Sequence, residues 1–223
     1  MTVDEEMRER ESNVPASTGE GGSWAVPVIV GGIVLLAVGY VALSLQRPEP
    51  PTFPASPTDP RPADGELVGP RTYTVDASVP DRWVHFSFEE GTVVENPGPL
   101  DWDLAFRRFD MAVNGGEGFS GRGGVRDLGE VPFDSVLRAP EGGYEQVEAR
   151  ADSVNPALAR WYDYSFLTHL LTPTERVYAV RTAQGRYAKL EFLSYYCPGA
   201  RPGCITFRYV YQGAGGRELS SDP

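Results

Sequence analysis

Few side chains in this sequence have the chemistry of a metal site. The chain contains two histidines, His85 and His169, and two cysteines, Cys197 and Cys204. These are too few for a zinc, iron–sulfur or haem-rich site with several soft ligands, so we predict no metal site of that kind. The cysteines bracket the turn-rich sequence Pro-Gly-Ala-Arg-Pro-Gly between two strand-like runs. We therefore predict a disulfide that closes a hairpin loop in an oxidising compartment, with two free thiols in a reducing cell as the alternative.

Three motifs suggest catalysis or cofactor binding, but the residues around them favour a structural role. Residues 116–121 fit GxGxxG, but Arg-Gly-Gly follows, where a dinucleotide site needs the start of a helix. Ser120 is not in a GxSxG elbow, because Arg122 stands at the position of the second glycine. Asp101 and Asp103 could act as an acid–base pair or share a calcium ion, but a solvated strand face is the simpler interpretation. We predict no catalytic residue, and hence a protein that is not an enzyme.

Charge excludes another class of function. The 223 residues carry 20 Lys plus Arg against 31 Asp plus Glu, a net charge of −11, and Lys189 is the single lysine. Nucleic-acid binders need a cationic surface that displaces counterions from phosphates. We therefore predict no nucleic-acid partner.

The N-terminal part of the chain predicts a membrane anchor. Residues 1–24 form a polar, acidic tail, and residues 25–45 are 21 consecutive residues without a charge. Such a run can cross a bilayer core of about 30 Å at about 1.5 Å per residue. Trp24 and Tyr40 are the aromatic residues near its ends. We predict one transmembrane helix in contact with membrane lipid. A cleaved signal peptide is the alternative, which the long acidic leader disfavours.

A proline-rich segment follows the predicted helix. Eight prolines occur in the 24 residues from Arg47 to Pro70, and such sequences are extended and semi-rigid. We predict that residues 46–70 form a stalk. Arginines lie on both sides of the apolar run, so only the predicted disulfide indicates the orientation. It places the N-terminus in the cytoplasm and the C-terminal domain in the periplasm.

Residues 71–223 are expected to fold as one β-rich domain. Runs rich in Val, Tyr, Phe and Thr alternate with turn signals, at 71–78, 83–94, 102–113, 176–196 and 204–212. In the second run, Trp83, His85 and Ser87 would face one way and the intervening apolar residues the other, as in a half-buried strand. One helical or irregular stretch is expected near 155–171. The fold class is therefore all-β, preceded by one transmembrane α-helix.

The order of segments resembles the HmuY-like family. The segments are VHFSFEEGTVV, DWDLAFRRFDMAVNGG, GRGGVRDLGEVPFDSV, WYDYSFLTHLL, YAVRTAQGRYAKLEFLSYY and CITFRYVYQ, over most of residues 71–212. The resemblance implies a β-rich exported domain and, in its founding members, haem held between two side chains. In the segment Phe106–Phe109, where some relatives place a histidine, this chain has arginine, which cannot bind iron. His169 with His85, or His169 with Met111, would be the candidate haem ligands.

We expect an interaction protein rather than a haem carrier, and so no resident cofactor, with haem as the alternative. The aromatic residues Trp161, Tyr162 and Tyr164 could form a partner interface or a core, and Trp24 and Tyr40 could contact partners at the membrane. The predicted function is an accessory subunit of an integral-membrane protein complex in a bacterial inner or intracytoplasmic membrane. From the family resemblance alone, a photosynthetic reaction-centre and light-harvesting assembly is one such host. The alternative is a haem- or porphyrin-binding protein of a haem-uptake system.

Overall fold

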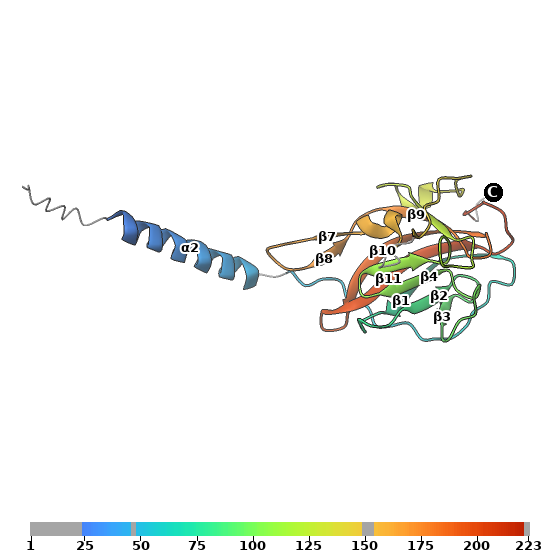
Figure 1. Ribbon diagram of the computed structural model, residues 1–223, viewed down its shortest axis with the longest axis horizontal. Helices are drawn as coiled ribbons and strands as arrows, with labels where there is room; N and C mark the ends of the chain where they lie inside the picture. Colours follow the sequence, from blue (N-terminus) through green and yellow to red (C-terminus); the bar gives the residue numbers. More distant parts are fainter. Residues whose placement is uncertain (1–23, 46–47, 149–153, 221–223) are drawn as a thin grey trace, which may run out of the picture. The chain divides into compact units, whose positions relative to one another are not determined.

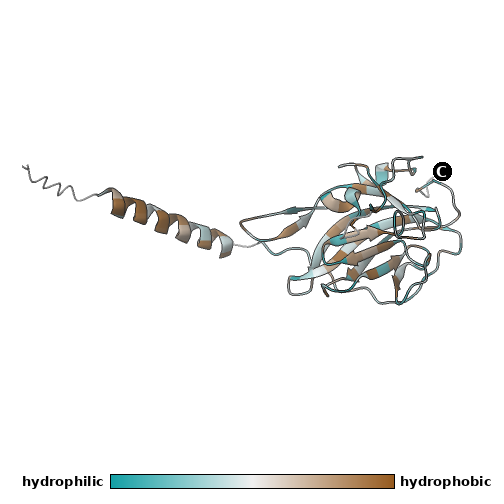
Figure 2. Ribbon diagram, viewed as in Figure 1, coloured by the Kyte–Doolittle hydropathy of each residue, from teal (hydrophilic) through white to brown (hydrophobic). Residues whose placement is uncertain are grey.

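The computed structural model describes residues 24–45, 48–148 and 154–220. It divides the chain into two compact units, Met1–Gln46 and Arg47–Pro223. In the first unit, α2 (Ala25–Leu45) is long and apolar enough to cross a membrane. Most of its ribbon has the colour of hydrophobic residues in Figure 2, as expected when no face of a helix packs on a soluble core. Apart from Trp24, the predicted acidic tail lies outside the described residues.

The second unit is built from two antiparallel sheets and a separate hairpin (Figure 1). The larger sheet has the strand order β1 (Leu67–Asp76), β11 (Arg201–Gln212), β10 (Tyr187–Cys197), β9 (Val177–Arg181), β6 (Gly124–Asp127). The smaller sheet has the order β3 (Thr92–Val94), β2 (Val84–Ser87), β4 (Leu104–Arg107), β5 (Asp110–Val113). The hairpin pairs β7 (Tyr162–Tyr164) with β8 (Leu171–Pro173), and the 3₁₀ helices are η1 (Phe133–Ser135) and η2 (Pro156–Arg160).

Aromatic side chains fill the space between the two sheets. The ring of Phe86 on β2 lies 5.1 Å from that of Phe207 on β11 and 5.0 Å from that of Tyr73 on β1. Phe106 on β4 stacks on Phe207 at 5.7 Å. Each ring removes a large apolar area from water, which stabilises the fold by about 1.5–3 kcal/mol per side chain. The packed faces therefore hold the two sheets together as a sandwich.

The predicted strands are present, and the all-β prediction is confirmed. The structure adds β6, β7 and β8, which lie in segments with weaker alternation. The predicted alternation of β2 holds only in part. Trp83 and His85 are partly exposed as expected, but Ser87 is buried. The turn after β2 folds back on this end of the strand, where the backbone N–H of Glu90 donates to the Ser87 hydroxyl.

The segment expected to form a stalk instead lies along the β unit. Four of its backbone N–H groups donate to backbone carbonyls of the β unit at 2.8–3.0 Å. The donor and acceptor pairs are Phe53 and Tyr196, Ser56 and Thr74, Arg61 and Glu90, and Ala63 and Glu89. Ala63 is buried, and β1 already begins at Leu67. Proline leaves carbonyls and neighbouring N–H groups available, so an extended proline-rich chain can still pair along a sheet edge. The folded unit therefore begins about 20 residues before the predicted boundary at residue 71.

Two truncations test this boundary. Removal of residues 1–47 should leave the β unit folded, because its core lies in the second compact unit. Removal of residues 1–66 should lower the free energy of unfolding by about 2.5–7.5 kcal/mol, because it removes these four backbone hydrogen bonds and the one from Gly213 to the Glu66 carbonyl, at about 0.5–1.5 kcal/mol each. Urea unfolding followed by tryptophan fluorescence would compare the two. Equal stability would mean that the segment is a stalk after all.

Candidate functional site

The β7–β8 hairpin carries the largest group of exposed apolar side chains in the described part of the β unit. Near its tip, Phe166 is 80% exposed, Leu167 50% and Tyr164 46%. Phe109, in the turn between β4 and β5, is 45% exposed and its ring lies 6.0 Å from that of Tyr162 on β7. We call Phe109, Tyr164, Phe166, Leu167 and the nearby His169 the hairpin surface. An apolar surface of this kind typically marks a binding site.

His169 is an exposed member of the hairpin surface. Its backbone N–H donates to the Ser165 carbonyl at 2.8 Å, and its φ of 54° lies in the left-handed region. The Tyr164 hydroxyl lies 2.8 Å from the imidazole Nδ1. A hydrogen bond at one ring nitrogen orients a histidine, and a bond in which that nitrogen donates its N–H is the usual support of a metal-binding imidazole. The hairpin thus presents an oriented histidine beside exposed aromatic rings.

The base of the hairpin is anchored in the core. Trp161 is 1% exposed, its indole N–H donates to the Phe109 carbonyl at 3.0 Å, and its ring lies 5.0 Å from that of Phe192. Its assignment to a partner interface is therefore wrong, because no part of the ring is accessible to a partner. Tyr162 is half-buried against the core, and Tyr164 is exposed. Of the predicted aromatic interface on the β unit, Tyr164 alone is exposed, at 46%.

The other two candidate haem ligands lie elsewhere. His85 on β2 is half-buried, its ring 4.8 Å from that of Trp102, and burial lowers the pKa of its imidazole. Met111 on β5 is 1% exposed and belongs to the core. Its thioether cannot reach a bound ligand unless the core opens, so Met111 is wrong as a candidate iron ligand. His85 and His169 belong to different sheets and have different ring partners.

Two arginines, Arg107 and Arg108, directly precede Phe109 in the chain. Arg107 forms an ion pair with Asp110 at 3.1 Å, and its guanidinium lies 4.6 Å from the centre of the Trp83 ring. Arg108 donates to the carbonyls of Ser78 and Pro202 and forms no ion pair with a described carboxylate. Arginine is the side chain best suited to a carboxylate ligand, because its N–H groups match both oxygens. Arg108, next to Phe109 in the chain, is therefore the arginine of this turn without a described carboxylate partner.

Cys197 and Cys204 form a disulfide between β10 and β11, with their Cα atoms 4.9 Å apart. The predicted pairing is confirmed. A carboxylate oxygen of Asp76 lies within 4.8 Å of both sulfur atoms, but sulfurs joined in a disulfide are not thiolate ligands. This group is structural.

Comparison with known proteins establishes the family. The sequence model of the HmuY protein family matches residues 80–209. The chain belongs to the HmuY family. Its β unit is called the HmuY domain below.

Solved structures share this fold. The chain is 21% identical to an apo HmuY analogue from Tannerella forsythia, covering 66% of this chain and 97% of that one, with a TM-score of 0.51. It is 22% identical to a Bacteroides vulgatus protein described as HmuY-like and haem-binding, covering 69% and 96%, with a TM-score of 0.52. A Bacteroides fragilis lipoprotein is 21% identical, covering 63% and 88%, with a TM-score of 0.50. No curated protein matches this sequence.

The glycine-rich motif at residues 116–121 lies in the loop between β5 and β6 of the HmuY domain. The backbone of Gly116 pairs with Val147, and the next regular element is a strand. A phosphate-binding GxGxxG loop needs a helix N-terminus at this point. The motif therefore positions the chain and does not bind a nucleotide.

Asp101 and Asp103 have separate roles in the HmuY domain. The exposed Asp101 accepts a hydrogen bond from the backbone N–H of Gly98 at 2.9 Å. Asp103 is buried and accepts backbone N–H bonds from Phe88 at 2.8 Å and Ala183 at 2.9 Å. Burial raises the pKa of the Asp103 carboxyl to about 6. Only Asp101 faces solvent, so the two carboxylates do not form a shared ion site.

Sequence analysis missed the residues that complete the hairpin surface. Phe109 and Arg108 are about 60 positions from His169 along the chain, and no sequence pattern connects the two segments. A signal was present for Phe166 and Leu167, two adjacent apolar residues in a stretch without strand alternation. Adjacent apolar side chains in irregular chain often remain exposed, because no single face can bury both.

The raised pKa of Asp103 makes stability depend on pH. The folded state favours the protonated carboxyl. Its contribution to the free energy of unfolding is therefore complete below pH 3.8 and is lost as pH rises through about 6. At 1.36 kcal/mol per pKa unit, the free energy of unfolding should fall by about 3 kcal/mol over this range relative to Asp103→Asn. Urea unfolding from pH 4 to pH 7 would measure the difference.

Asp101→Asn is the matched control for this series, because its side chain is exposed at the surface. It should leave the pH dependence unchanged. If the wild-type protein instead gained stability over Asp103→Asn as pH rose, the ionised carboxylate would be the favoured form in the fold.

Proposed function

We propose that this chain is a non-catalytic binding protein whose HmuY domain binds haem or a related porphyrin at the hairpin surface. The observation that carries the proposal is the exposed imidazole of His169, oriented by Tyr164 and surrounded by exposed apolar side chains. Porphyrins are flat and apolar, with carboxylate groups at one edge and, in haem, an iron that accepts an imidazole nitrogen. The apolar side chains, His169 and Arg108, which precedes Phe109 in the chain, match these three features in turn.

Each part of the ligand has a counterpart. Phe166, Leu167 and Phe109 would cover the macrocycle, His169 would donate to the iron, and Arg108 would pair with a carboxylate. Haem bound here would supply redox and axial-ligand chemistry at its iron. The residues of this chain would orient that iron and exclude water from one face. The relative from Bacteroides vulgatus, described as haem-binding, is in accord with this function.

We also propose that α2 anchors the protein and that the HmuY domain lies outside the cytoplasm. The helix is long and apolar enough to span a membrane, and the Cys197–Cys204 disulfide is typical of an oxidising compartment. The bacterial inner or intracytoplasmic membrane, with the N-terminus in the cytoplasm, is the location that this orientation favours. The accessory role in an integral-membrane complex, with a photosynthetic assembly as one host, stays a prediction. Trp24, Tyr40 and Tyr164 have exposed side chains, as a contact with such partners requires.

A haem titration tests the binding function. The full chain in detergent micelles, titrated with ferric haem, should develop a Soret band that saturates at one equivalent. His169→Ala should shift this band and weaken binding at least tenfold, because the iron loses its imidazole ligand. Arg108→Gln should weaken binding about five- to tenfold, since one charged hydrogen bond is typically about 1–1.5 kcal/mol.

His85→Ala is the matched control for the histidine, because His85 lies on β2 of the smaller sheet. It should leave the Soret band unchanged. A wild-type protein that gives no saturable band, or a band that survives in His169→Ala and is lost in His85→Ala, would exclude the hairpin surface as the haem site.

A further inference from the structure

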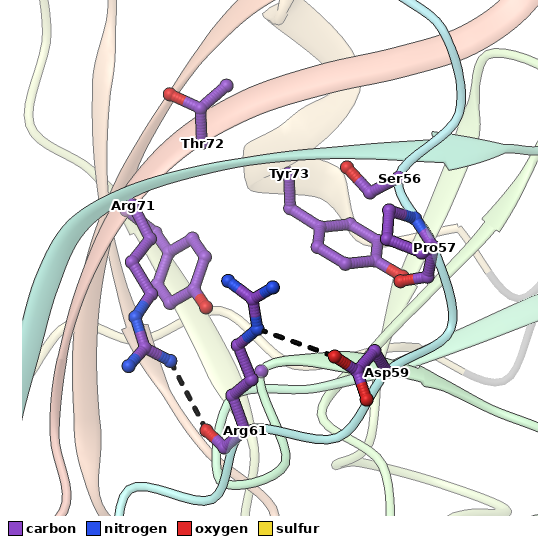
Figure 3. Close-up of a pocket in the computed structure, with 9 residues that line it drawn as sticks. Ser56, Pro57, Asp59, Arg61, Arg71, Thr72 and Tyr73 are labelled. Atoms are coloured by element: carbon purple, nitrogen blue, oxygen red, sulfur yellow. Dashed lines mark hydrogen bonds and ion pairs between the residues drawn. The ribbon is translucent and has the colours of Figure 1, made fainter.

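A small hollow lies between β1 and the proline-rich segment that enters the HmuY domain. It has a volume of about 110 Å³, and its lining includes Ser56, Asp59, Arg61, Arg71 and Tyr209 (Figure 3). None of these residues belongs to the hairpin surface. The hollow exists only because residues 56–61 lie against the sheet rather than extending as a stalk.

Two guanidinium groups border this hollow with little negative charge to balance them. Arg71 forms no ion pair within 4.0 Å in the described part of the chain, and one of its N–H groups donates to the Arg61 carbonyl at 3.2 Å. Arg61 is paired only with Asp59, at 3.8 Å, and both side chains are about two-thirds exposed. In Figure 3 the Arg61 guanidinium lies between Arg71 and Tyr73. With the single carboxylate of Asp59, the two arginines leave the hollow one positive charge in an acidic protein.

Two hydroxyl groups add neutral donors. Tyr209 is 1% exposed and lines the hollow together with Arg71, so its O–H can donate into the hollow. Burial raises the pKa of this phenol and keeps it protonated at neutral pH. The Ser56 hydroxyl accepts from the backbone N–H of Thr74 at 3.0 Å, which leaves its proton to donate. The hydroxyl of Tyr73 is already shared with Thr92 and Pro57.

We propose that this hollow binds one small oxyanion group, a phosphate or a carboxylate, between Arg61 and Arg71. Forked guanidinium donors match the oxygens of both groups, and the hydroxyls of Tyr209 and Ser56 supply further hydrogen bonds. The volume of about 110 Å³ accepts a single such group. The site is independent of haem binding, because the two share no residue.

Isothermal titration calorimetry on the full chain tests the proposal. The protein is held in maltoside micelles, which contain neither phosphate nor carboxylate, and ionic strength is kept constant with sodium chloride. Sodium phosphate and sodium acetate are titrated separately, and the anion that binds more tightly identifies the group. Arg71→Gln should reduce the affinity at least tenfold, because a guanidinium with no carboxylate partner is lost. Arg61→Gln should reduce it by a smaller factor, since this side chain is more exposed and already has Asp59 as a partner.

Arg138→Gln is the matched control. Arg138 is an exposed arginine paired with Glu218 at 2.9 Å and does not line the hollow, so this variant should bind as the wild-type protein does. If Arg71→Gln does not fold, as judged by circular dichroism, the exposed Arg61→Gln decides. The proposal is overturned if neither anion gives saturable heat, or if binding is unchanged in the arginine variants that fold.

Discussion

The packing of aromatic rings between the two sheets is the interaction on which the rest of the HmuY domain depends. Phe86 contacts rings from β1 and β11, and Phe88 contacts Tyr209 and Tyr211 on β11. Edge-to-face and offset pairs of this kind are more favourable than their buried area alone. Asp103 adds a polar link, because its carboxyl accepts N–H groups from Phe88 beside the smaller sheet and from Ala183 in the turn of the larger one. These contacts together fix the position of one sheet relative to the other.

This rigid core explains why binding residues can lie on short, exposed elements. The β7–β8 hairpin has only three residues in each strand, which is too few to be stable alone. It is held by the buried Trp161 and by the Tyr196 hydroxyl, which accepts the backbone N–H of Leu171 at 2.8 Å. Its base is thus fixed, and its tip can expose Phe166 and Leu167 to a ligand. A rigid scaffold that positions variable loops is the usual arrangement in binding proteins.

The proline-rich segment before β1 likewise depends on the scaffold for its position. Its backbone pairs with Thr74, Glu89, Glu90 and Tyr196, so it contributes to stability and also forms one wall of the hollow at Arg71. The two proposed sites are consequently supported by the same scaffold but use different chemistry. The hairpin surface is apolar with a histidine, whereas the hollow is small and basic. Family membership accounts for the scaffold, and only the side chains of this chain determine what each site can bind.

The sequence by itself determined the elements and their class. A charge-free run of 21 residues specified α2, alternation specified most strands, and two cysteines around a turn specified the disulfide. Only the tertiary structure decided which apolar residues became core, because aromatic composition is the same for a core and an interface. It buried Trp161 and Met111, and it joined Phe109 to Trp161 across 52 positions. It also placed the proline-rich segment on the sheet, since extended proline-rich chain has the same local conformation whether it is free or paired.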